Sequence, residues 1–208
     1  MRSPVICGSR GSPLALHQTQ QVLDRLQACY AGVQFQLKVI RTEGDRDRRR
    51  PLSEMGGRGV FVRELETALL RKEIDLAVHS LKDLPTQTPP SLVLAAFSER
   101  EEFRDALVSP RWGCPLAELP PGASLGTGSP RRAAQLLAFR PDLKMVELRG
   151  NVDTRLRKAQ DLDGIIVAAV GLERLGYQGS ITQYLSSDVC LPAPGQGALA
   201  VEVRADDD

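Results

Sequence analysis

Two adjacent arginines stand at the start of a predicted helix, where positive charge is unfavourable. In the segment GTGSPRR, Gly126–Arg132, Ser129 suits the N-cap and Pro130 suits the first helical position. Arg131 and Arg132 then fall in the first turn, where each cation opposes the helix dipole by about 0.3–1 kcal/mol. An anionic ligand on the free N–H groups would offset both charges. The alternative is a pair of solvated arginines at a helix end; we favour the anion site.

Other arginines follow predicted strands in a similar way. The carboxyl ends of strands are where ligands bind in open α/β sheets, so arginines gathered there predict a ligand with several carboxylates or phosphates. Arg149 and Arg155 flank a predicted helix start and could converge on a second anion. The residues concerned are Arg10 and Ser12 in GSRGSP, Arg149 and Arg155 in LRGNVDTRLRK, and Arg174 in GLERLG.

A carboxylate follows a buried apolar run in the segment AVHSLKDLP. The run Ile74–Val78 is typical of a strand, and His79, Lys82 and Asp83 come at its end. Asp83 is a candidate acid–base group or cation stabiliser. It is equally compatible with a residue that caps the next turn. We expect His79 to be a hydrogen-bonded core histidine.

Composition excludes several classes of protein. The chain has 208 residues, of which 42% are hydrophobic and 25% charged, as in a globular protein. No apolar run approaches the roughly 20 residues of a membrane helix, and the first residues lack the apolar core of a secretory signal. A net charge of +1 and an aromatic content of 4% disfavour a nucleic-acid binder. Neither a phosphate-binding glycine motif nor a C-x-x-C pair occurs, so no nucleotide or metal site is predicted.

Strands and helices alternate along the chain, which predicts an α/β fold with largely parallel pairing. Two breaks, at Ser98–Asp105 and Leu191–Gly197, are candidate linkers, and Arg41–Gly59 is predicted to be a long mobile loop. The segments GSRGSPLALHQ and GTGSPRRAAQ both lead from a strand through Ser-Pro into a helix, as if one element were used once in each of two domains. The predicted strands are Pro4–Gly8, Phe35–Ile40, Ile74–Val78, Leu92–Phe97, Asp105–Val108, Ser124–Gly126, Lys144–Leu148, Ile165–Val170 and Ala198–Val203; the predicted helices are Pro13–Ala28, Val60–Leu70, Arg131–Phe139 and Val152–Ala159.

Seven segments together resemble the hydroxymethylbilane synthase family, also called the porphobilinogen deaminase family. They occur in the family's order and cover nearly the whole chain: SRGSPLALHQ, GGRGVFVRELE, DLAVHSLKDLP, GTGSPRRAAQL, LRGNVDTRL, GLERLG and LPAPGQGALA. The resemblance implies two α/β domains like those of type II periplasmic binding proteins, with mixed, mainly parallel sheets. Domain 1 would comprise residues 1–98 and 195–208, and domain 2 would be inserted over residues 99–194.

The resemblance also implies an activity. The family consists of cytoplasmic transferases of tetrapyrrole (haem) biosynthesis, which join four porphobilinogen molecules head to tail into hydroxymethylbilane and release ammonia at each step. The growing chain is attached to a dipyrromethane primer, the family's cofactor, which is bound to a cysteine. We therefore expect porphobilinogen as the partner, a monomer, and neither nucleic acid nor membrane as a binding partner.

Site residues follow from the resemblance by position in the motifs. Asp83 would be the catalytic carboxylate that contacts pyrrole N–H groups, assists ammonia loss and stabilises the azafulvene cation. A second set would bind the acetate and propionate side chains of primer and substrate. This set is Arg10, Ser12, Gln18, Arg58, Phe61, Lys82, Thr127, Ser129, Arg131, Arg132, Arg149, Arg155, Arg174 and Gln196.

The sequence departs from the family pattern in two places. Arg58 replaces the usual lysine of the GGKG turn, which keeps the charge but changes its geometry. The sequence ends at Asp208, where the family continues into a third domain with the primer-bearing cysteine. We therefore expect a two-domain chain that binds no primer and turns over poorly, if at all, by itself.

Two other functions remain open from the sequence. A non-catalytic two-domain clamp for a small polycarboxylate would use the same fold and arginines, and it should tolerate the substitution Asp83→Asn. A nucleic-acid binder would use the arginine-rich loop Arg46–Arg50. Strong retention on heparin that is lost with this loop would indicate the second.

Overall fold

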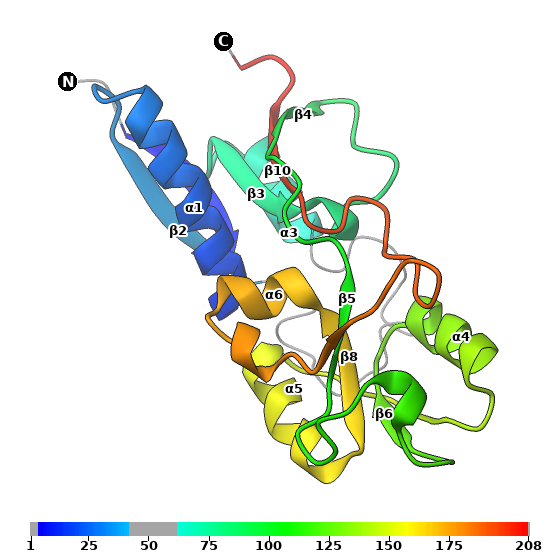
Figure 1. Ribbon diagram of the computed structural model, residues 1–208. Helices are drawn as coiled ribbons and strands as arrows, with labels where there is room; N and C mark the ends of the chain where they lie inside the picture. The colour runs from blue at the N-terminus through cyan, green and yellow to red at the C-terminus, as the bar shows by residue number, and fades with distance from the viewer. Residues whose placement is uncertain (1–3, 42–61, 208) are drawn as a thin grey trace. The chain divides into compact units, whose positions relative to one another are not determined.

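The computed structural model describes residues 4–41 and 62–207 (Figure 1). The chain forms two compact units: Met1–Arg100 with Gly197–Asp208 make unit 1, and Glu101–Gln196 make unit 2. Two predicted site residues, Arg58 and Phe61, lie outside the described residues, as does the predicted loop beyond Arg41.

Unit 1 is a five-stranded sheet with the strand order β2-β1-β3-β10-β4. Strand β1 pairs in parallel with β2 and β3, whereas β10 pairs antiparallel to β3 and β4. The 3-10 helix η2 follows β3 directly. The elements are β1 (Val5–Arg10), α1 (Pro13–Cys29), β2 (Phe35–Ile40), α3 (Arg63–Leu70), β3 (Leu76–Ser80), η2 (Leu81–Asp83), β4 (Leu92–Phe97) and β10 (Leu199–Arg204).

Alternation along β3 distributes the core of unit 1 over both faces of the sheet. Leu76 and Val78 pack in one apolar cluster with Val22 of α1. Ala77, between them, packs in a second cluster with Leu65 of α3. Because successive side chains of a strand point to opposite faces, α1 and α3 cover opposite faces of the sheet.

Unit 2 is built on a similar plan, with the strand order β7-β6-β8-β5-β9. Strand β6 pairs in parallel with β7 and β8, whereas β5 pairs antiparallel to β8 and β9. The elements are β5 (Asp105–Val108), η3 (Leu116–Glu118), β6 (Ser124–Gly126), α4 (Pro130–Phe139), β7 (Lys144–Val146), α5 (Val152–Lys158), η4 (Ala159–Asp161), β8 (Gly164–Ala168), α6 (Ala169–Arg174), η5 (Gln178–Ser180) and β9 (Gln183–Tyr184).

The core of unit 2 also has two sides. Leu136 of α4 packs with Leu107 and Ile166 in one cluster. Ile165 of β8 and Leu172 of α6 belong to a second cluster. Helices α4 and α6 therefore cover opposite faces of this sheet, since Ile165 and Ile166 are neighbours on one strand.

The predicted α/β class with mixed sheets is confirmed, but the pairing is not mainly parallel as predicted, because each described sheet has two parallel and two antiparallel pairings. The strand predicted over Ile165–Val170 is wrong at its end, because β8 stops at Ala168 and Ala169 begins α6. A short apolar run cannot be distinguished from a buried helix by periodicity alone. The strand predicted from Ile74 begins two residues later, at Leu76. No helix in the described part of the chain is long and apolar enough to cross a membrane.

Candidate functional site

The carboxyl ends of β6, β7 and β8 lie at one edge of the unit 2 sheet, because the three strands are parallel. The loops that follow β6 and β7 are in contact there. The Thr127 backbone N–H donates to the Val146 carbonyl over 2.9 Å. A Cβ on Gly128 would lie 2.8 Å from the Leu148 carbonyl oxygen, so only glycine allows this approach. The residues before α4 are thereby held beside those before α5.

Helix α4 begins as the sequence predicts. Ser129 is the N-cap in extended conformation, and its Oγ accepts the Arg132 N–H over 3.5 Å, with Pro130 at the first helical position. The Thr127 Oγ1 accepts the Ser129 N–H over 3.2 Å. Both hydroxyls therefore order the backbone at the start of the helix.

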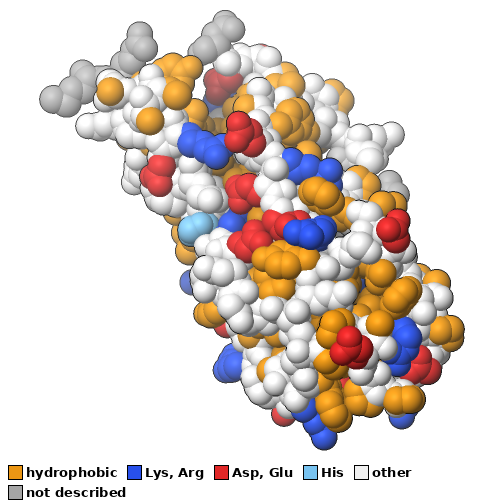
Figure 2. Space-filling model, viewed as in Figure 1, with side chains coloured by type: hydrophobic (Ala, Val, Ile, Leu, Met, Phe, Trp, Pro, Cys, Tyr) orange, Lys and Arg blue, Asp and Glu red, His pale blue; other side chains and the backbone are white. Residues whose placement is uncertain are grey.

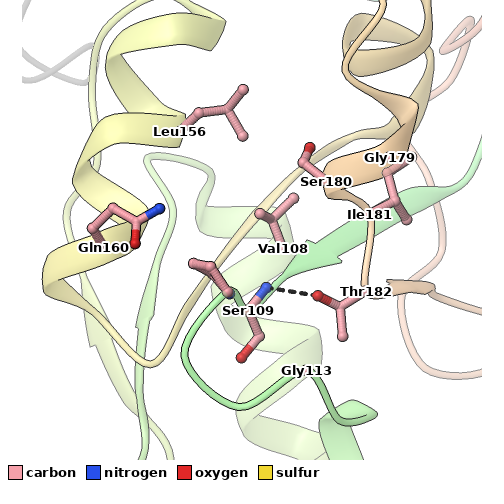
Figure 3. Close-up of a pocket in the computed structure, with 10 residues that line it drawn as sticks. Val108, Ser109, Gly113, Leu156, Gln160, Gly179, Ser180, Ile181 and Thr182 are labelled. Carbon is pink, nitrogen blue, oxygen red and sulfur yellow. Dashed lines mark hydrogen bonds between the residues drawn. The ribbon is translucent and has the colours of Figure 1, made fainter.

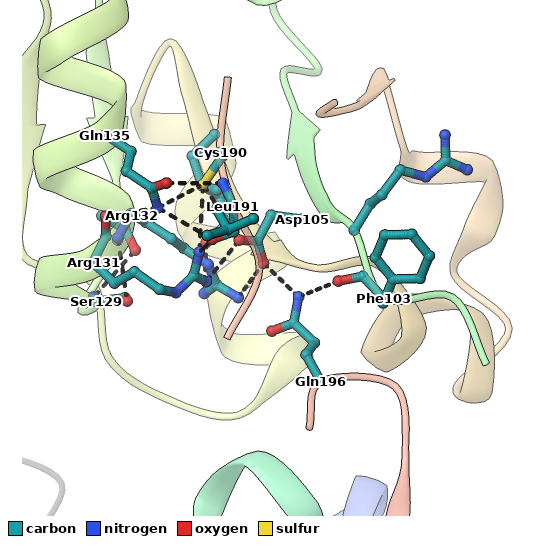
Figure 4. Close-up of polar contacts among 12 residues, drawn as sticks. Phe103, Asp105, Ser129, Arg131, Arg132, Gln135, Cys190, Leu191 and Gln196 are labelled. Carbon is teal, nitrogen blue, oxygen red and sulfur yellow. Dashed lines mark hydrogen bonds and ion pairs between the residues drawn. The ribbon is translucent and has the colours of Figure 1, made fainter. Parts of the chain in front are cut away.

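The two arginines of the first turn share one buried carboxylate (Figure 4). Arg131 and Arg132 each donate from Nη2 to Asp105, over 2.7 Å and to different carboxylate oxygens. Asp105 is completely buried at the first position of β5. An anion that offsets the two arginines is thus present in the chain itself, where the sequence predicted one in a ligand. Asp105 is not among the predicted site residues; its signal in the sequence is a charged residue that opens an otherwise apolar strand.

Two further donors complete the shell of Asp105. Gln196 Nε2 donates to Oδ1 over 2.9 Å, and the Cys190 thiol donates to Oδ2 over 3.4 Å. Burial by itself would raise the pKa of Asp105, but the attraction of Arg132 and the hydrogen bonds from Arg132, Gln196 and Arg131 lower it to about 2. Burial, with the negative charge of Asp105 nearby, raises the pKa of the Cys190 thiol to about 11. At neutral pH the cluster therefore contains one carboxylate and a neutral thiol.

Two other predicted arginines of unit 2, and the predicted glutamine, are also held by protein groups. Arg155 Nε donates to the Gly150 carbonyl over 2.8 Å. Arg174 is buried and its guanidinium contacts both oxygens of Glu101, over 3.1 and 3.2 Å. Gln196 is 1% exposed and also donates to the Phe103 carbonyl over 2.7 Å. Arg149 is half-buried in the loop between β7 and α5.

In unit 1, the ends of the parallel strands β1 and β3 lie at one edge of the sheet. Arg10 is the last residue of β1, and Ser12 is the N-cap of α1, with its Oγ accepting the Ala15 N–H over 3.2 Å. Gln18 is buried and exchanges hydrogen bonds with the Ser80 hydroxyl at the end of β3, over 3.0 and 3.3 Å. Gln18 thus attaches α1 to the strand that leads to Asp83.

Asp83 is an exposed carboxylate in η2, directly after β3. It forms no ion pair with any residue that the structure describes. Lys82 precedes it and is half-buried. Asp83 is therefore exposed just after the carboxyl end of a buried strand, where the sequence placed it.

His79 is a core histidine, and its partner is a carboxylate. Its Nε2 lies 3.1 Å from Oε2 of Glu202 on the neighbouring strand β10. Both side chains are buried, and Glu202 Oε1 has no hydrogen-bond partner among the described residues. Burial and the charge of Glu202 raise the pKa of Glu66 on α3, against the opposing charges of His79 and Arg63.

A pocket of about 500 Å³ in unit 2 lies away from these residues (Figure 3). It forms where β5 ends at Val108, next to the start of β8, and its wall includes Ser109 and Thr182. No residue that lines it is ionisable, so it does not match a ligand with several carboxylates. The predicted site lies instead at the opposite edge of the sheet, where β6 and β8 end.

Comparison with known proteins identifies relatives along the whole chain. Residues 5–208 match the family model described as "Porphobilinogen deaminase, dipyromethane cofactor binding domain". The porphobilinogen deaminase of Carboxydothermus hydrogenoformans is 52% identical over 209 aligned residues, covering 100% of this chain and 67% of the relative. That of Desulforudis audaxviator is 53% identical with the same coverage of 100% and 67%. The chain thus spans about two thirds of the length of these relatives.

Solved structures with low sequence identity share the fold. A lipoprotein of Actinomyces odontolyticus superposes with a TM-score of 0.58 at 16% identity, covering 99% of this chain and 84% of the other. A lipoprotein of Bacillus subtilis described as methionine-binding gives a TM-score of 0.54 at 11% identity, covering 98% and 84%. The expected likeness to type II periplasmic binding proteins is therefore confirmed for the fold.

Proposed function

Because the chain belongs to the porphobilinogen deaminase family, we propose that it supplies the substrate-binding and catalytic groups of that reaction in tetrapyrrole biosynthesis. The reaction joins four porphobilinogen molecules head to tail into hydroxymethylbilane and releases ammonia. Unit 2 would bind carboxylates, and unit 1 would contribute the catalytic carboxylate. We further propose that the protein is a cytoplasmic monomer with no nucleic-acid or membrane partner.

The observation that carries this proposal is the start of α4. Porphobilinogen has two carboxylates, and each unit added to the growing chain brings two more. The N-terminus of α4 combines a Ser129 cap, backbone N–H groups and the guanidinium of Arg131, which is 27% exposed. A helix N-terminus with an arginine fork matches a carboxylate in both charge and geometry.

The same donor set fits the dipyrromethane primer, whose side chains are also carboxylates. Thr127, Ser129, Arg131 and Arg132 would hold these groups in unit 2, and Arg10 with Ser12 would do so in unit 1. When bound, the primer supplies the pyrrole carbon to which the next unit is joined. The role of the chain's own residues is to neutralise and orient the carboxylates.

Asp83 is suited to the chemical step in this proposal. Loss of ammonia from porphobilinogen leaves a delocalised cation, and a fixed carboxylate stabilises such a cation as it develops. Asp83 is exposed at the end of β3, and the Gln18–Ser80 hydrogen bonds fix the strand end that precedes it. Its carboxylate would accept the pyrrole N–H and keep the reacting carbon in place.

The surface agrees with a small-molecule enzyme. On the face shown in Figure 2, Lys and Arg side chains lie among Asp and Glu side chains. Nucleic-acid binding proteins typically carry a basic stripe or patch. This mixed pattern, with a net charge of +1, supports a small anionic substrate over a nucleic acid.

The test separates binding from chemistry. Calorimetry should show porphobilinogen binding to the wild-type chain, weakened roughly tenfold or more by Arg131→Gln, since a hydrogen bond to a charged group contributes about 1.5–3 kcal/mol. Asp83→Asn should retain binding, and the low porphobilinogen consumption expected of the wild-type chain should fall roughly 100-fold in this variant. Asp163→Asn, which removes a carboxylate elsewhere in unit 2, is the control for net charge.

Two results would contradict the proposal. One is the absence of porphobilinogen binding to the wild-type chain. The other is binding that Arg131→Gln does not change. Porphobilinogen binding and consumption that are both unchanged in Asp83→Asn would instead indicate the non-catalytic polycarboxylate clamp.

A further inference from the structure

We propose that Asp105 is a positioning residue that limits the charge of the α4 start, so that this site holds one ligand carboxylate reversibly. This inference rests on the proposed function, because it assumes that the ligand carboxylate binds beside Arg131. It concerns a residue that does not itself contact the ligand.

The contacts of Asp105 leave it no role as a ligand-facing acid. Both oxygens are used, Oδ1 by Arg132 and Gln196 and Oδ2 by Arg131 and Cys190. The side chain is completely buried. A carboxylate with four donors and no exposed surface can act only through the groups that it holds.

Asp105 fixes the direction of both guanidinium groups. Arg132 is 8% exposed and also donates from Nη1 to the Ile166 carbonyl over 3.4 Å. Arg131 donates from Nη1 to the Leu191 carbonyl. With Nη2 of each arginine on Asp105, both forks are anchored at two points (Figure 4). The site is therefore assembled before a ligand arrives, which reduces the entropy lost on binding.

The charges of the cluster do not cancel. Two guanidinium groups face one carboxylate, and the Cys190 thiol stays neutral at physiological pH because its pKa is raised to about 11. One net positive charge remains, next to the positive end of the α4 dipole. The exposed part of this charge is on Arg131, so the cluster attracts one carboxylate rather than two.

An excess charge would be costly for an enzyme that must move its substrate. Without Asp105 the same place would carry two positive charges in a buried environment, where the attraction for an anion is stronger than in water. A ligand held this tightly is released slowly, since differences in affinity are mostly differences in dissociation rate. Asp105 thus keeps the site attractive to a carboxylate but allows exchange.

The experiment compares porphobilinogen binding by Asp105→Asn and Asp163→Asn. Both substitutions remove one negative charge from unit 2, but Asp163 accepts hydrogen bonds from Ser124 and Trp112 instead of the α4 arginines. In calorimetry at low salt, Asp105→Asn should bind porphobilinogen roughly tenfold more tightly, with a steeper loss of affinity on addition of salt. Asp163→Asn should bind as the wild type does.

A double variant keeps the inference testable if Asp105→Asn fails to fold. Asp105→Asn with Arg131→Gln removes one charge of each sign, so its cluster again has one net positive charge. This variant should fold, and it should bind porphobilinogen more tightly than Arg131→Gln alone, whose cluster has no net charge. Inorganic phosphate serves as a second probe and should raise the melting temperature of Asp105→Asn more than that of the wild type.

The outcomes distinguish this inference from the proposed function. Unchanged or weaker binding in a folded Asp105→Asn, beside normal binding in the wild type, overturns the role of Asp105 alone. Failure of the wild-type chain to bind porphobilinogen overturns the proposed function instead.

Discussion

The two units use one strand–turn–helix element with different electrostatics. In both, a strand leads through a serine N-cap and a proline into a helix, at Ser12 and Ser129. Each unit also buries a carboxylate completely, Glu202 in unit 1 and Asp105 in unit 2. Asp105 accepts four hydrogen bonds, two of them from the arginines at the start of α4, whereas Glu202 contacts His79 on the face that α3 covers. The buried carboxylate of unit 2 therefore holds the arginines of a helix start, whereas that of unit 1 contacts a histidine on the neighbouring strand.

The largest loss of stability should come from a substitution at the partner of Glu202, because this buried carboxylate has one oxygen without a hydrogen-bond partner among the described residues. His79→Leu removes the hydrogen-bond partner of buried Glu202 and should reduce the free energy of unfolding by about 3–5 kcal/mol, measured by urea denaturation. The matched control is His17→Leu, because His17 is exposed on α1, and it should change stability little. Equal effects of the two substitutions would show that the His79–Glu202 pair does not stabilise unit 1.

Acid should weaken unit 2 through Asp105. The pKa of this carboxyl is about 2 in the folded chain against an ordinary value of 3.8, because Arg132, Gln196 and Arg131 together outweigh the effect of burial. A lowered pKa stabilises the fold above pH 3.8, and this stabilisation of about 2 kcal/mol disappears as the pH falls towards 2. Urea denaturation between pH 5 and about pH 2.5 should therefore show a steeper loss in the wild type than in Asp105→Asn. Asp24→Asn, on the exposed face of α1, should follow the wild type; parallel curves for all three would contradict the assignment.

Substitution of the glycine before each serine N-cap should have a different effect on stability in the two units. A Cβ on Gly128 would lie 2.8 Å from a backbone oxygen, whereas one on Gly11 would lie 3.3 Å from a methyl group of Val39. Backbone cannot yield as a side chain does, so Gly128→Ala should cost about 1–3 kcal/mol and Gly11→Ala less than about 1. Thermal or urea unfolding of the two variants checks this order. A larger cost at Gly11 would mean that the contact between the loops after β6 and β7 is not tight.

The smallest effect should come from the caps themselves. Ser12 accepts its capping hydrogen bond over 3.2 Å and Ser129 over 3.5 Å. Ser12→Ala should therefore lower stability by about 1 kcal/mol and Ser129→Ala by less, in the same unfolding assay. The corresponding Ser→Gly variants should cost only a few tenths of a kcal/mol, and a reversed order of the alanine variants would remove this distinction between the two helix starts.

Local patterns were sufficient for much of the fold. The Ser-Pro signals placed the starts of α1 and α4 correctly, because capping depends on residues that are neighbours in sequence. Apolar runs located most strands. The errors lie where a local pattern is ambiguous: the buried run after Ile165 changes from strand to helix at Ala169, and the two-residue strand β9 is too short to give a period.

What the sequence by itself determined was most of the element order, the two helix starts and the family; it also predicted that the arginines bind a carboxylate ligand. Only the tertiary structure decided how those arginines are balanced. Asp105 precedes Arg132 by 27 residues and Gln196 follows Asp105 by 91, and no periodicity links positions so far apart. Their contact exists because β5 lies antiparallel to β8 and begins where β8 ends, at Ala168. The electrostatics of the site is a property of strand pairing, which brings together charges that the chain keeps apart.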